Sequence, residues 1–496
     1  IGNIDEEAAT VINAKGLCLT PGFIDSHGHS DTKIFEDPVC AYKLRQGVTT
    51  EISGNCGTTL APVSDKNFPS YQKYMTAFNN PVTEEYKKYD TFGKYLDEVE
   101  KLKLGINLCC YVGHAAIRMA AMGYDDREPT KDEMEYMKNL VREAMESGAL
   151  GMTSGLAYAP GSFSNQKEIT EICSVVGEYG GIYCSHIRNS GNEVCKSVAD
   201  TIEVGRKTGC KIVIAHNKVS GKENWGRSVD NIKLIHDAVD EGLDVSHDVY
   251  PYTASSTTLN ISMPPSYLGM GLDVLADKIQ DRDFQLELKD KIFNPVEVWG
   301  NGLRSLGYGA YLITAAPETP EAVGKTILEY AEYIGLDEFD AYVDILAKNR
   351  LRVIAITFGM SEEDVVNFLK SEYAMIGSDG VYIPGDTVTH PRGIGCFPRF
   401  LGRYVRDKKV VTLEEGIRKM TSLPAEKYFL KNKGKIEKGF DADLILFNPD
   451  TIIDQADYRH PFLDNLGISY ILVNGNIAVK DNVIVNHKAG RLIRRK

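Results

Sequence analysis

The sequence has few of the features that mark membrane, secreted or nucleic-acid-binding proteins. It contains no run of about eighteen apolar residues, so no membrane-spanning helix is expected. The opening segment IGNIDEEAAT lacks the basic and apolar parts of a secretory signal and has no initiator Met, so the native start is expected upstream of Ile1. Acidic residues outnumber basic ones by 69 to 56, and the formal net charge of −13 argues against a nucleic-acid partner.

Cysteine occurs without a pairing pattern. The ten cysteines lie at positions 18, 40, 56, 109, 110, 173, 184, 195, 210 and 396, most of them inside apolar runs. Because no secretory signal accompanies them, they predict reduced, buried thiols and a cytoplasmic protein. The remaining composition, 43% hydrophobic and 25% charged residues, is that of an ordinary globular chain that needs no disulfides to form its core.

A helix followed by a short apolar strand is the recurring unit of the middle of the chain. Thr130 and Glu133 have the spacing of a capping box, apolar residues then recur every three or four positions, and Gly148 ends the predicted helix before ALGMTSG. The same order recurs where VCKSVADTIEVGRKTG leads into CKIVIAH and where SVDNIKLIHDAVDEG leads into LDVSHDVYPY. Repeated helix–strand units predict a parallel sheet.

Eight strand candidates predict an α/β fold of the (β/α)8, or TIM-like, barrel type. They span residues 22–29, 49–57, 106–114, 149–155, 181–186, 211–216, 243–250 and 374–379. Residues 253–358 are too many for a simple connection and predict an inserted lid. Within that stretch, the apolar run 351–360 is left open as an alternative seventh strand.

The two ends of the chain differ from the middle. GKIEKGFDADLILFN, ISYILVNGNIAV and DNVIVN alternate apolar and polar residues between Gly and Asn-Gly turns, and ATVINAKGLCLTPG near the N-terminus has the same character. The sequence therefore predicts a small β-domain built from residues 1–20 and 434–496. It predicts the barrel within residues 21–433, with the lid at about 253–358.

Metal-ligand residue types follow most of the predicted barrel strands. His27 and His29 are two residues apart, which places both on one face of a strand. Further candidates end other strands, at Cys56, His186, His216 and Asp379. The carboxyl ends of barrel strands meet at the face that holds active sites, so this set predicts a zinc site of imidazoles and a thiolate, with a carboxylate as ligand or base.

Three other histidines carry weaker signals. His236 lies mid-helix and is interpreted as an ordinary polar residue, while His114 and His247 remain undecided. A single histidine at a strand end is more often hydrogen-bonded than metal-bound, and Cys56 alone would be interpreted as a buried thiol. The combination of His-x-His with ligand types one β/α repeat apart is what favours a metal site.

Several motifs resemble the amidohydrolase superfamily. PGFIDSHGHSD is similar to its first-strand metal motif, IGSDG to its catalytic-aspartate segment, and GKIEKGFDADLILF to the start of its C-terminal β-domain. Many members carry a carboxylated lysine on the fourth strand, but ALGMTSGL has none, and SGNCG offers the Cys56 thiolate instead. That difference narrows the resemblance to the D-aminoacylase (N-acyl-D-amino-acid deacylase) branch, which GLAYAPG, SHIRN, AHNKVSG, DVYPYTASST and HPRGIGCFPRFLGRYVR also resemble. Relatives carry further strands ahead of residues 1–20, so the chain resembles a truncated member.

The resemblance implies a role for each candidate. It assigns the tighter zinc ion to Cys56, His186 and His216, and a second, weaker position to His27, His29 and Asp379. It also makes Asp379 the base that takes a proton from water and passes it to the leaving amine. The positions that match the family's substrate-binding residues are Tyr158, Lys218, Tyr250 and Arg392. Among these, Arg392 suits a carboxylate best, because a guanidinium donates two parallel hydrogen bonds to one.

These features predict a zinc-dependent hydrolase that cleaves the amide of N-acyl-D-amino acids, releasing a carboxylate and a free D-amino acid. The small-molecule substrate is the partner indicated, and the oligomeric state is left open. One alternative is another amidase of the superfamily, such as a hydantoinase or dihydroorotase, which the missing strand-four lysine disfavours. The other is a non-catalytic metal-binding barrel, which a complete ligand set beside a base disfavours.

Overall fold

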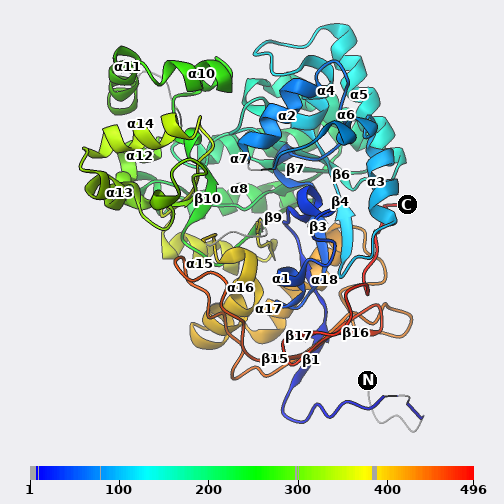
Figure 1. The fold of residues 1–496 in the computed structure, drawn as a ribbon. Coiled ribbons are helices and arrows are strands. Elements are labelled where there is room, and N and C mark those ends of the chain that lie inside the picture. Colours follow the sequence, from blue (N-terminus) through cyan, green and yellow to red (C-terminus); the bar gives the residue numbers. More distant parts are fainter. Residues whose placement is uncertain (1–6, 9, 79, 296–298, 300, 382–387) are drawn as a thin grey trace.

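Eight parallel strands form a barrel at the centre of the protein (Figure 1). The structure is a computed structural model, and it describes the chain except residues 1–6, 9, 79, 296–298, 300 and 382–387. The barrel strands are β2 (Phe23–Asp25), β3 (Val48–Ser53), β4 (Asn107–Cys110) with its continuation β5 (Val112–Gly113), β6 (Gly151–Gly155), β7 (Ile182–His186), β8 (Lys211–Ile214), β9 (Val245–Val249) and β13 (Ala374–Ile376).

Backbone hydrogen bonds close this barrel. β2, β3 and β4 pair in that order, and the order continues from β5 through β6, β7, β8 and β9 to β13, with every pair parallel. The ring is completed by a bridge between Gly28 and Gly380 and by the Ser26 N–H, which donates to Ile376 O at 3.2 Å. The predicted (β/α)8 barrel is confirmed, and each of the eight strand candidates contributes a barrel strand.

Helices follow the strands and cover the barrel, as the sequence pattern predicts. They are α1 (Ala41–Leu44), α2 (Phe68–Ala77), α3 (Phe92–Glu100), α4 (His114–Met122), α5 (Lys131–Glu146), α6 (Gln166–Glu178), α7 (Val194–Thr208), α8 (Ser228–Asp240), α15 (Glu362–Lys370), α16 (Arg392–Arg399), α17 (Leu413–Met420) and α18 (Ser422–Lys427). The capping box of α5 forms as expected, since Thr130 Oγ1 accepts from Glu133 N and Glu133 Oε2 accepts from Thr130 N. Gly148 follows the helix with a φ of 102°, which explains why glycine stands there.

The long segment between β9 and β13 folds as an α/β unit of its own, drawn in green at the upper left of Figure 1. Its antiparallel sheet has the order β10 (Ser255–Thr258), β12 (Ile354–Thr357), β11 (Tyr311–Ala315). Its helices are α9 (Pro265–Leu268), α10 (Leu272–Lys278), α11 (Arg282–Phe293), α12 (Gly302–Leu306), α13 (Ile327–Ile334) and α14 (Glu338–Lys348), and they enclose a separate apolar core. The run 351–360 therefore supplies β12 of this insert, and the alternative of a seventh barrel strand there is excluded.

The two ends of the chain share one antiparallel sheet, as expected. Its order is β1 (Cys18–Pro21), β14 (Leu444–Phe447), β15 (Ile468–Val473), β16 (Asn476–Lys480) and β17 (Val483–Ile484). β1 from the N-terminal part thus pairs directly with β14 from the C-terminal part. The last residues then return to the barrel, where Ile493 N donates to Leu108 O at 2.8 Å and Arg494 forms ion pairs with α3.

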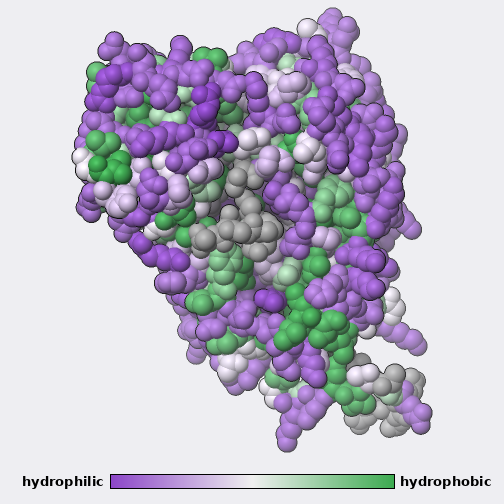
Figure 2. Space-filling view, viewed as in Figure 1, coloured by the Kyte–Doolittle hydropathy of each residue, from purple (hydrophilic) through white to green (hydrophobic). Residues whose placement is uncertain are grey.

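The surface and the cysteines agree with the composition. Hydrophilic residues cover most of the face drawn in Figure 2. All ten cysteines are free thiols. Among the described residues, no helix is both long and apolar enough to cross a membrane.

A buried ionic cluster lies where the barrel closes. Lys43 of α1 is fully buried, and its Nζ lies 2.5 Å from Asp25 Oδ2, 3.1 Å from Glu51 Oε2 and 2.7 Å from Ser378 Oγ. Burial lowers the pKa of Lys43, but the two carboxylates outweigh burial and raise it above the ordinary lysine value. One cation therefore ties β2, β3 and the segment after β13 together.

Lys43→Met is expected to lower the free energy of unfolding by about 3–5 kcal/mol, because it leaves two buried carboxylates without their cation. Urea denaturation of the variant and the wild type measures this. Lys33→Met is the matched control, since Lys33 pairs with the half-exposed Glu36 and such pairs contribute about 1 kcal/mol or less. Equal losses in the two variants would contradict the assignment.

Candidate active site

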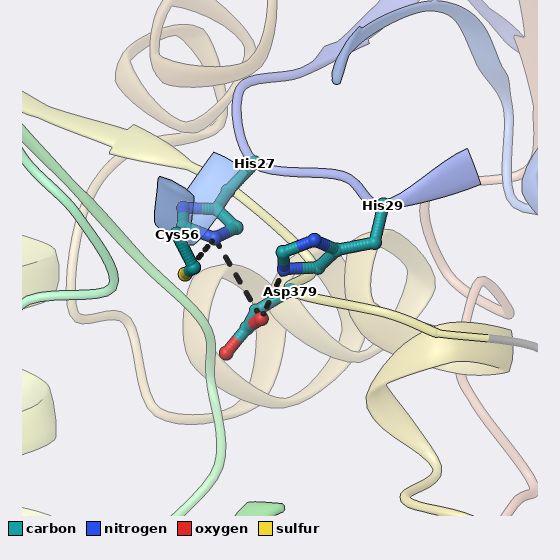
Figure 3. Close-up of side chains that lie close together, drawn as sticks. All are labelled: His27, His29, Cys56 and Asp379. Atoms are coloured by element: carbon teal, nitrogen blue, oxygen red, sulfur yellow. Dashed lines mark hydrogen bonds and ion pairs between the residues drawn. The ribbon is translucent and has the colours of Figure 1, made fainter. Parts of the chain in front are cut away.

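The six predicted metal-ligand residues come together at one end of the barrel. Their positions are just after β2 for His27 and His29, after β3 for Cys56, at the end of β7 for His186, after β8 for His216 and after β13 for Asp379. Figure 3 shows His27, His29, Cys56 and Asp379 converging from separate segments of the chain. Their ligand atoms form two groups that share the Cys56 sulfur, and within each group the atoms lie within 4.8 Å of one another.

The first group consists of Cys56, His186 and His216. His216 Nε2 lies 3.4 Å from Cys56 Sγ and 2.8 Å from His186 Nδ1. The side chains of His186 and His216 are almost completely buried. Three ligand atoms thus face a common point between β3, β7 and β8.

The second group consists of His27, His29 and Asp379, again with Cys56. Asp379 Oδ1 lies 3.1 Å from His29 Nε2 and 3.6 Å from His27 Nε2, and Cys56 Sγ lies 3.5 Å from His27 Nε2 (Figure 3). Cys56 therefore stands between two possible ion positions.

The protonation states of the first group, Cys56, His186 and His216, suit a zinc ion. Burial raises the pKa of the Cys56 thiol, but the nearby His27 and hydrogen bonds from His186 and His216 outweigh burial and bring it well below the ordinary value. Burial, together with Lys218, lowers the pKa of His216 to about 3, so this imidazole is neutral. A thiolate and neutral imidazoles are the forms that bind zinc, and the residues present fit that ion.

Three of the ligand residues have an unusual backbone. Cys56, His216 and Asp379 have φ values of 55°, 34° and 48°. These values lie in the left-handed region, which is unfavourable for residues other than glycine. Each such residue costs on the order of 1–3 kcal/mol, and conformations of this kind cluster at functional sites. The sharp turns after β3, β8 and β13 aim the side chains inward.

Asp248 of β9 is a site residue that the sequence analysis missed. Its Oδ1 lies 3.0 Å from His27 Nδ1, as an ion pair, and accepts a hydrogen bond from the His216 backbone N–H at 2.8 Å. Such a carboxylate fixes the orientation and tautomer of a ligand histidine. Strand alternation could have found it, because neighbouring residues of β9 point to opposite faces. His247 points the other way, packs against Phe368 and has no hydrogen-bond partner among the described residues.

Arg392, the first residue of α16, lies beside Asp379. Its Nη2 is 2.9 Å from Asp379 Oδ2, and its Nη1 is buried without a hydrogen-bond partner among the described residues. Burial raises the pKa of Asp379, but Arg392, together with His29 and His27, outweighs burial and holds it well below the ordinary value. Tyr250 lies under the guanidinium, 4.7 Å from ring centre to Cζ, and its hydroxyl does not line the main cavity.

Lys218 and Tyr158 flank the first ligand group. Lys218 Nζ lies 2.9 Å from His216 Nδ1, and burial lowers its pKa to about 8. The Tyr158 ring packs 4.7 Å from that of His186, and its hydroxyl accepts a hydrogen bond from Thr257 of β10 at 3.0 Å. Tyr158 therefore connects the ligands to the insert.

A cavity of about 1230 Å³ lies over these groups. His29, Cys56, His186, His216, Lys218, Tyr158, Asp379 and Arg392 line it from the barrel side. The insert supplies the opposite side, including the whole of β10. The space lies between the barrel and the insert and is open to solvent on one side, and it exceeds the usual size of a small-molecule site.

The remaining histidines with weaker signals lie outside this cavity. His114 is buried at the start of α4 and pairs with Glu168 at 3.0 Å. His236 is half-buried on α8, 4.0 Å from Glu372. Cys184, a buried thiol of β7, contacts Asn55 rather than the ligands.

Comparisons with known proteins agree with this site. The model of the amidohydrolase family matches residues 10–291 and 296–479. The D-aminoacylase of Alcaligenes xylosoxydans xylosoxydans is 34% identical, over 100% of this chain and 91% of that protein. The N-acyl-D-glutamate deacylase of the same organism is 34% identical, over 98% and 88%.

Solved structures give the same result. A structure of D-aminoacylase, studied for its binuclear metal center, has a TM-score of 0.80 at 33% identity and covers 97% of this chain and 90% of that one. The N-acyl-D-glutamate deacylase of Bordetella bronchiseptica, complexed with zinc and a phosphonate mimic of the tetrahedral intermediate, has a TM-score of 0.79 at 31% identity with the same coverage. The chain therefore belongs to the amidohydrolase family, in its branch of N-acyl-D-amino-acid deacylases.

Proposed function

We propose that the protein is a zinc-dependent hydrolase of N-acyl-D-amino acids. Water adds to the acyl carbon, the amide C–N bond breaks, and the products are a carboxylate and a free D-amino acid. The observation that carries this proposal is the cluster of Cys56, His186 and His216 beside the Asp379–Arg392 pair in one cavity. The named substrates of the relatives, N-acyl-D-amino acids, support it.

Two groups of residues would hold zinc. Cys56, His186 and His216 form the tighter position, because a thiolate and two buried imidazoles converge there. His27, His29 and Asp379 form the second one, with Cys56 between the two. A bound zinc ion supplies water of lowered pKa and polarises a carbonyl oxygen.

Asp379 is the proposed base and acid. Arg392 binds its Oδ2, and its Oδ1 faces the histidines of the second group. An ionised carboxylate in this place accepts a proton from the attacking water and delivers it to the amide nitrogen, which then leaves as an amine. Arg392 keeps the carboxylate oriented between the two tasks.

The α-carboxylate of the substrate is proposed to bind Arg392, whose buried Nη1 has no partner among the described residues. Lys218 and Tyr158 line the same cavity and offer an ammonium group and a hydroxyl. Tyr250 contributes by supporting the guanidinium from below. Fixing the carboxylate and the acyl carbonyl together leaves one direction for the side chain, so a single enantiomer fits.

The insert is proposed to act as a lid within the barrel segment 21–433. It corresponds to the expected lid at about 253–358, and it encloses the cavity opposite the ligands. The sheet formed by β1 and β14–β17 belongs to the proposed separate β-domain, and none of its strands lines the cavity. A cover of this kind reduces the exposure of the cavity to bulk water and so strengthens the charged contacts inside.

The alternatives are weaker. A hydantoinase-like or dihydroorotase-like site with a carboxylated lysine on the fourth strand is disfavoured, because β6 reads GMTSG. A non-catalytic barrel is also disfavoured. It would not need the Asp379 carboxylate beside Arg392, whose buried Nη1 has no hydrogen-bond partner among the described residues.

A substrate panel tests the proposal directly. The protein loaded with zinc is assayed with N-acetyl-D-amino acids, their L enantiomers and hydantoins. Turnover of the D amides is expected. Faster hydrolysis of an L enantiomer would overturn the D assignment, preferential ring opening of hydantoins would favour that alternative, and complete inactivity would favour a non-catalytic barrel.

Cys56→Ala is expected to lose tightly bound zinc and nearly all activity, because alanine cannot replace the charge of a thiolate ligand. Zinc per chain is measured after dialysis. Cys184→Ala is the matched control and should keep both, since its sulfur is buried away from the ligands. Full zinc content in the Cys56 variant would remove the thiolate from the site.

Asp379→Asn is expected to keep zinc bound by Cys56, His186 and His216 but to lower kcat by about 100- to 10,000-fold, the usual contribution of a positioned acid–base group. Steady-state kinetics and zinc analysis of the same preparation separate the two effects. Near-native turnover would place the base elsewhere.

Arg392→Ala is expected to raise KM for N-acetyl-D-amino acids by about tenfold or more, because hydrogen bonds to a charged group contribute about 1.5–3 kcal/mol. The corresponding amino-acid amides lack the carboxylate, so their KM should change far less. Equal changes for acid and amide substrates would rule out the carboxylate contact.

A further inference from the structure

His390 is a buried histidine that the site described so far does not use. It precedes α16, and its side chain is 3% exposed. Its Nδ1 accepts a hydrogen bond from the Arg392 backbone N–H at 3.0 Å, and its Nε2 donates to Ala254 O at 2.9 Å. Since an amide N–H only donates and a carbonyl only accepts, these contacts require the neutral ring with its proton on Nε2.

The backbone of Arg392 depends on this contact. Arg392 begins α16, and the first N–H groups of a helix have no partner within the helix. The His390 ring supplies one, and so fixes the backbone from which the guanidinium extends. Burial and the nearby Arg392 lower the pKa of His390 well below the ordinary value, so the accepting form of Nδ1 is maintained.

His390 and Arg392 also hold the same edge of the insert. His390 binds Ala254 O, and Arg392 Nη2 donates to Ser256 O at 3.4 Å. These two carbonyls belong to alternate residues of an extended segment, and they point to the same side. His390 therefore fixes the position of both the start of β10 and the residue that carries the guanidinium.

Three aromatic rings fix the His390 ring itself. Tyr250, Tyr252 and Tyr458 lie 6.2, 5.1 and 5.2 Å from it, measured between ring centres. Tyr458 comes from the C-terminal part of the chain, between β14 and β15. The ring thus sits where the barrel, the insert and the C-terminal segment meet.

We propose that His390 is a positioning residue for substrate binding: it holds the Arg392 guanidinium so that Nη1 remains available to the substrate carboxylate. This inference rests on the proposed function. Arg392 Nη2 already contacts Asp379 at 2.9 Å. Without the His390 contact, the first turn of α16 can shift and the guanidinium can pair fully with Asp379. The Arg392 guanidinium would then no longer be available to bind the substrate carboxylate.

Two substitutions separate the two hydrogen bonds of His390. In His390→Asn, the amide oxygen can accept from the N–H two residues later, as in an Asx-turn, so the Arg392 contact is kept. In His390→Gln, the longer amide can reach Ala254 O but leaves the Arg392 N–H without its acceptor. His247→Gln is the matched control, because it replaces an equally buried histidine away from the cavity.

The inference predicts a change in KM, not in kcat. For N-acetyl-D-amino acids, His390→Gln should raise KM about tenfold, while His390→Asn and His247→Gln stay within about threefold of the wild type. kcat should stay within about threefold in all variants, and KM for the corresponding amides should not change. Zinc content and melting temperature are measured on the same preparations.

A double-mutant cycle distinguishes positioning from a general structural defect. In the Arg392→Ala background, His390→Gln should change KM no further, because its effect acts through the guanidinium. Additive losses, equal effects on acid and amide, or an unchanged KM in His390→Gln would each overturn the inference. If the Gln variant does not fold, a KM in His390→Asn as high as that of Arg392→Ala would also overturn it. A zinc-loaded wild type without activity on any D substrate would instead refute the proposed function, and this inference with it.

Discussion

The ion pair between Asp379 and Arg392 determines how the site is organised. One oxygen of the carboxylate faces the histidines, and the other is bound by the guanidinium at 2.9 Å. Because both groups are buried, removing either one would leave the other as a buried charge without its partner, which is strongly unfavourable. This one contact therefore joins the metal-binding half of the cavity to the substrate-binding half.

The barrel stabilises the unfavourable backbone conformations and buried charges that this site requires. Left-handed backbone at Cys56, His216 and Asp379 is unfavourable, and the fully buried Lys43 cluster requires three charges inside the protein. A closed ring of backbone hydrogen bonds resists relaxation of these turns, since any one strand is bonded on both sides. The left-handed backbone at these three residues persists because the hydrogen-bonded strands on either side prevent the turns from relaxing.

The local pattern of the chain is sufficient to predict the barrel and to indicate the metal-ligand residue types that the structure brings together. Helix–strand periodicity located all eight strands, and His-x-His with Cys56 indicated the metal site. What could not be predicted depends on contacts between distant segments. The role of β12 in the insert, the position of Tyr250 below Arg392, and the hydrogen bonds of His390 follow from tertiary packing that no local spacing encodes. Asp248 is different, because its direction follows from the alternation of side chains along β9, which is a local pattern.

The shared terminal sheet has a consequence for synthesis. β1 lies near the start of the chain, and its partner β14 lies near the end. At about 5–20 residues per second, the ribosome delivers that partner on the order of tens of seconds later. Until then β1 presents an unpaired edge, which is the kind of surface that associates with other chains. This sheet therefore cannot be completed until residues 444–447 have been synthesised, long after the first barrel strands.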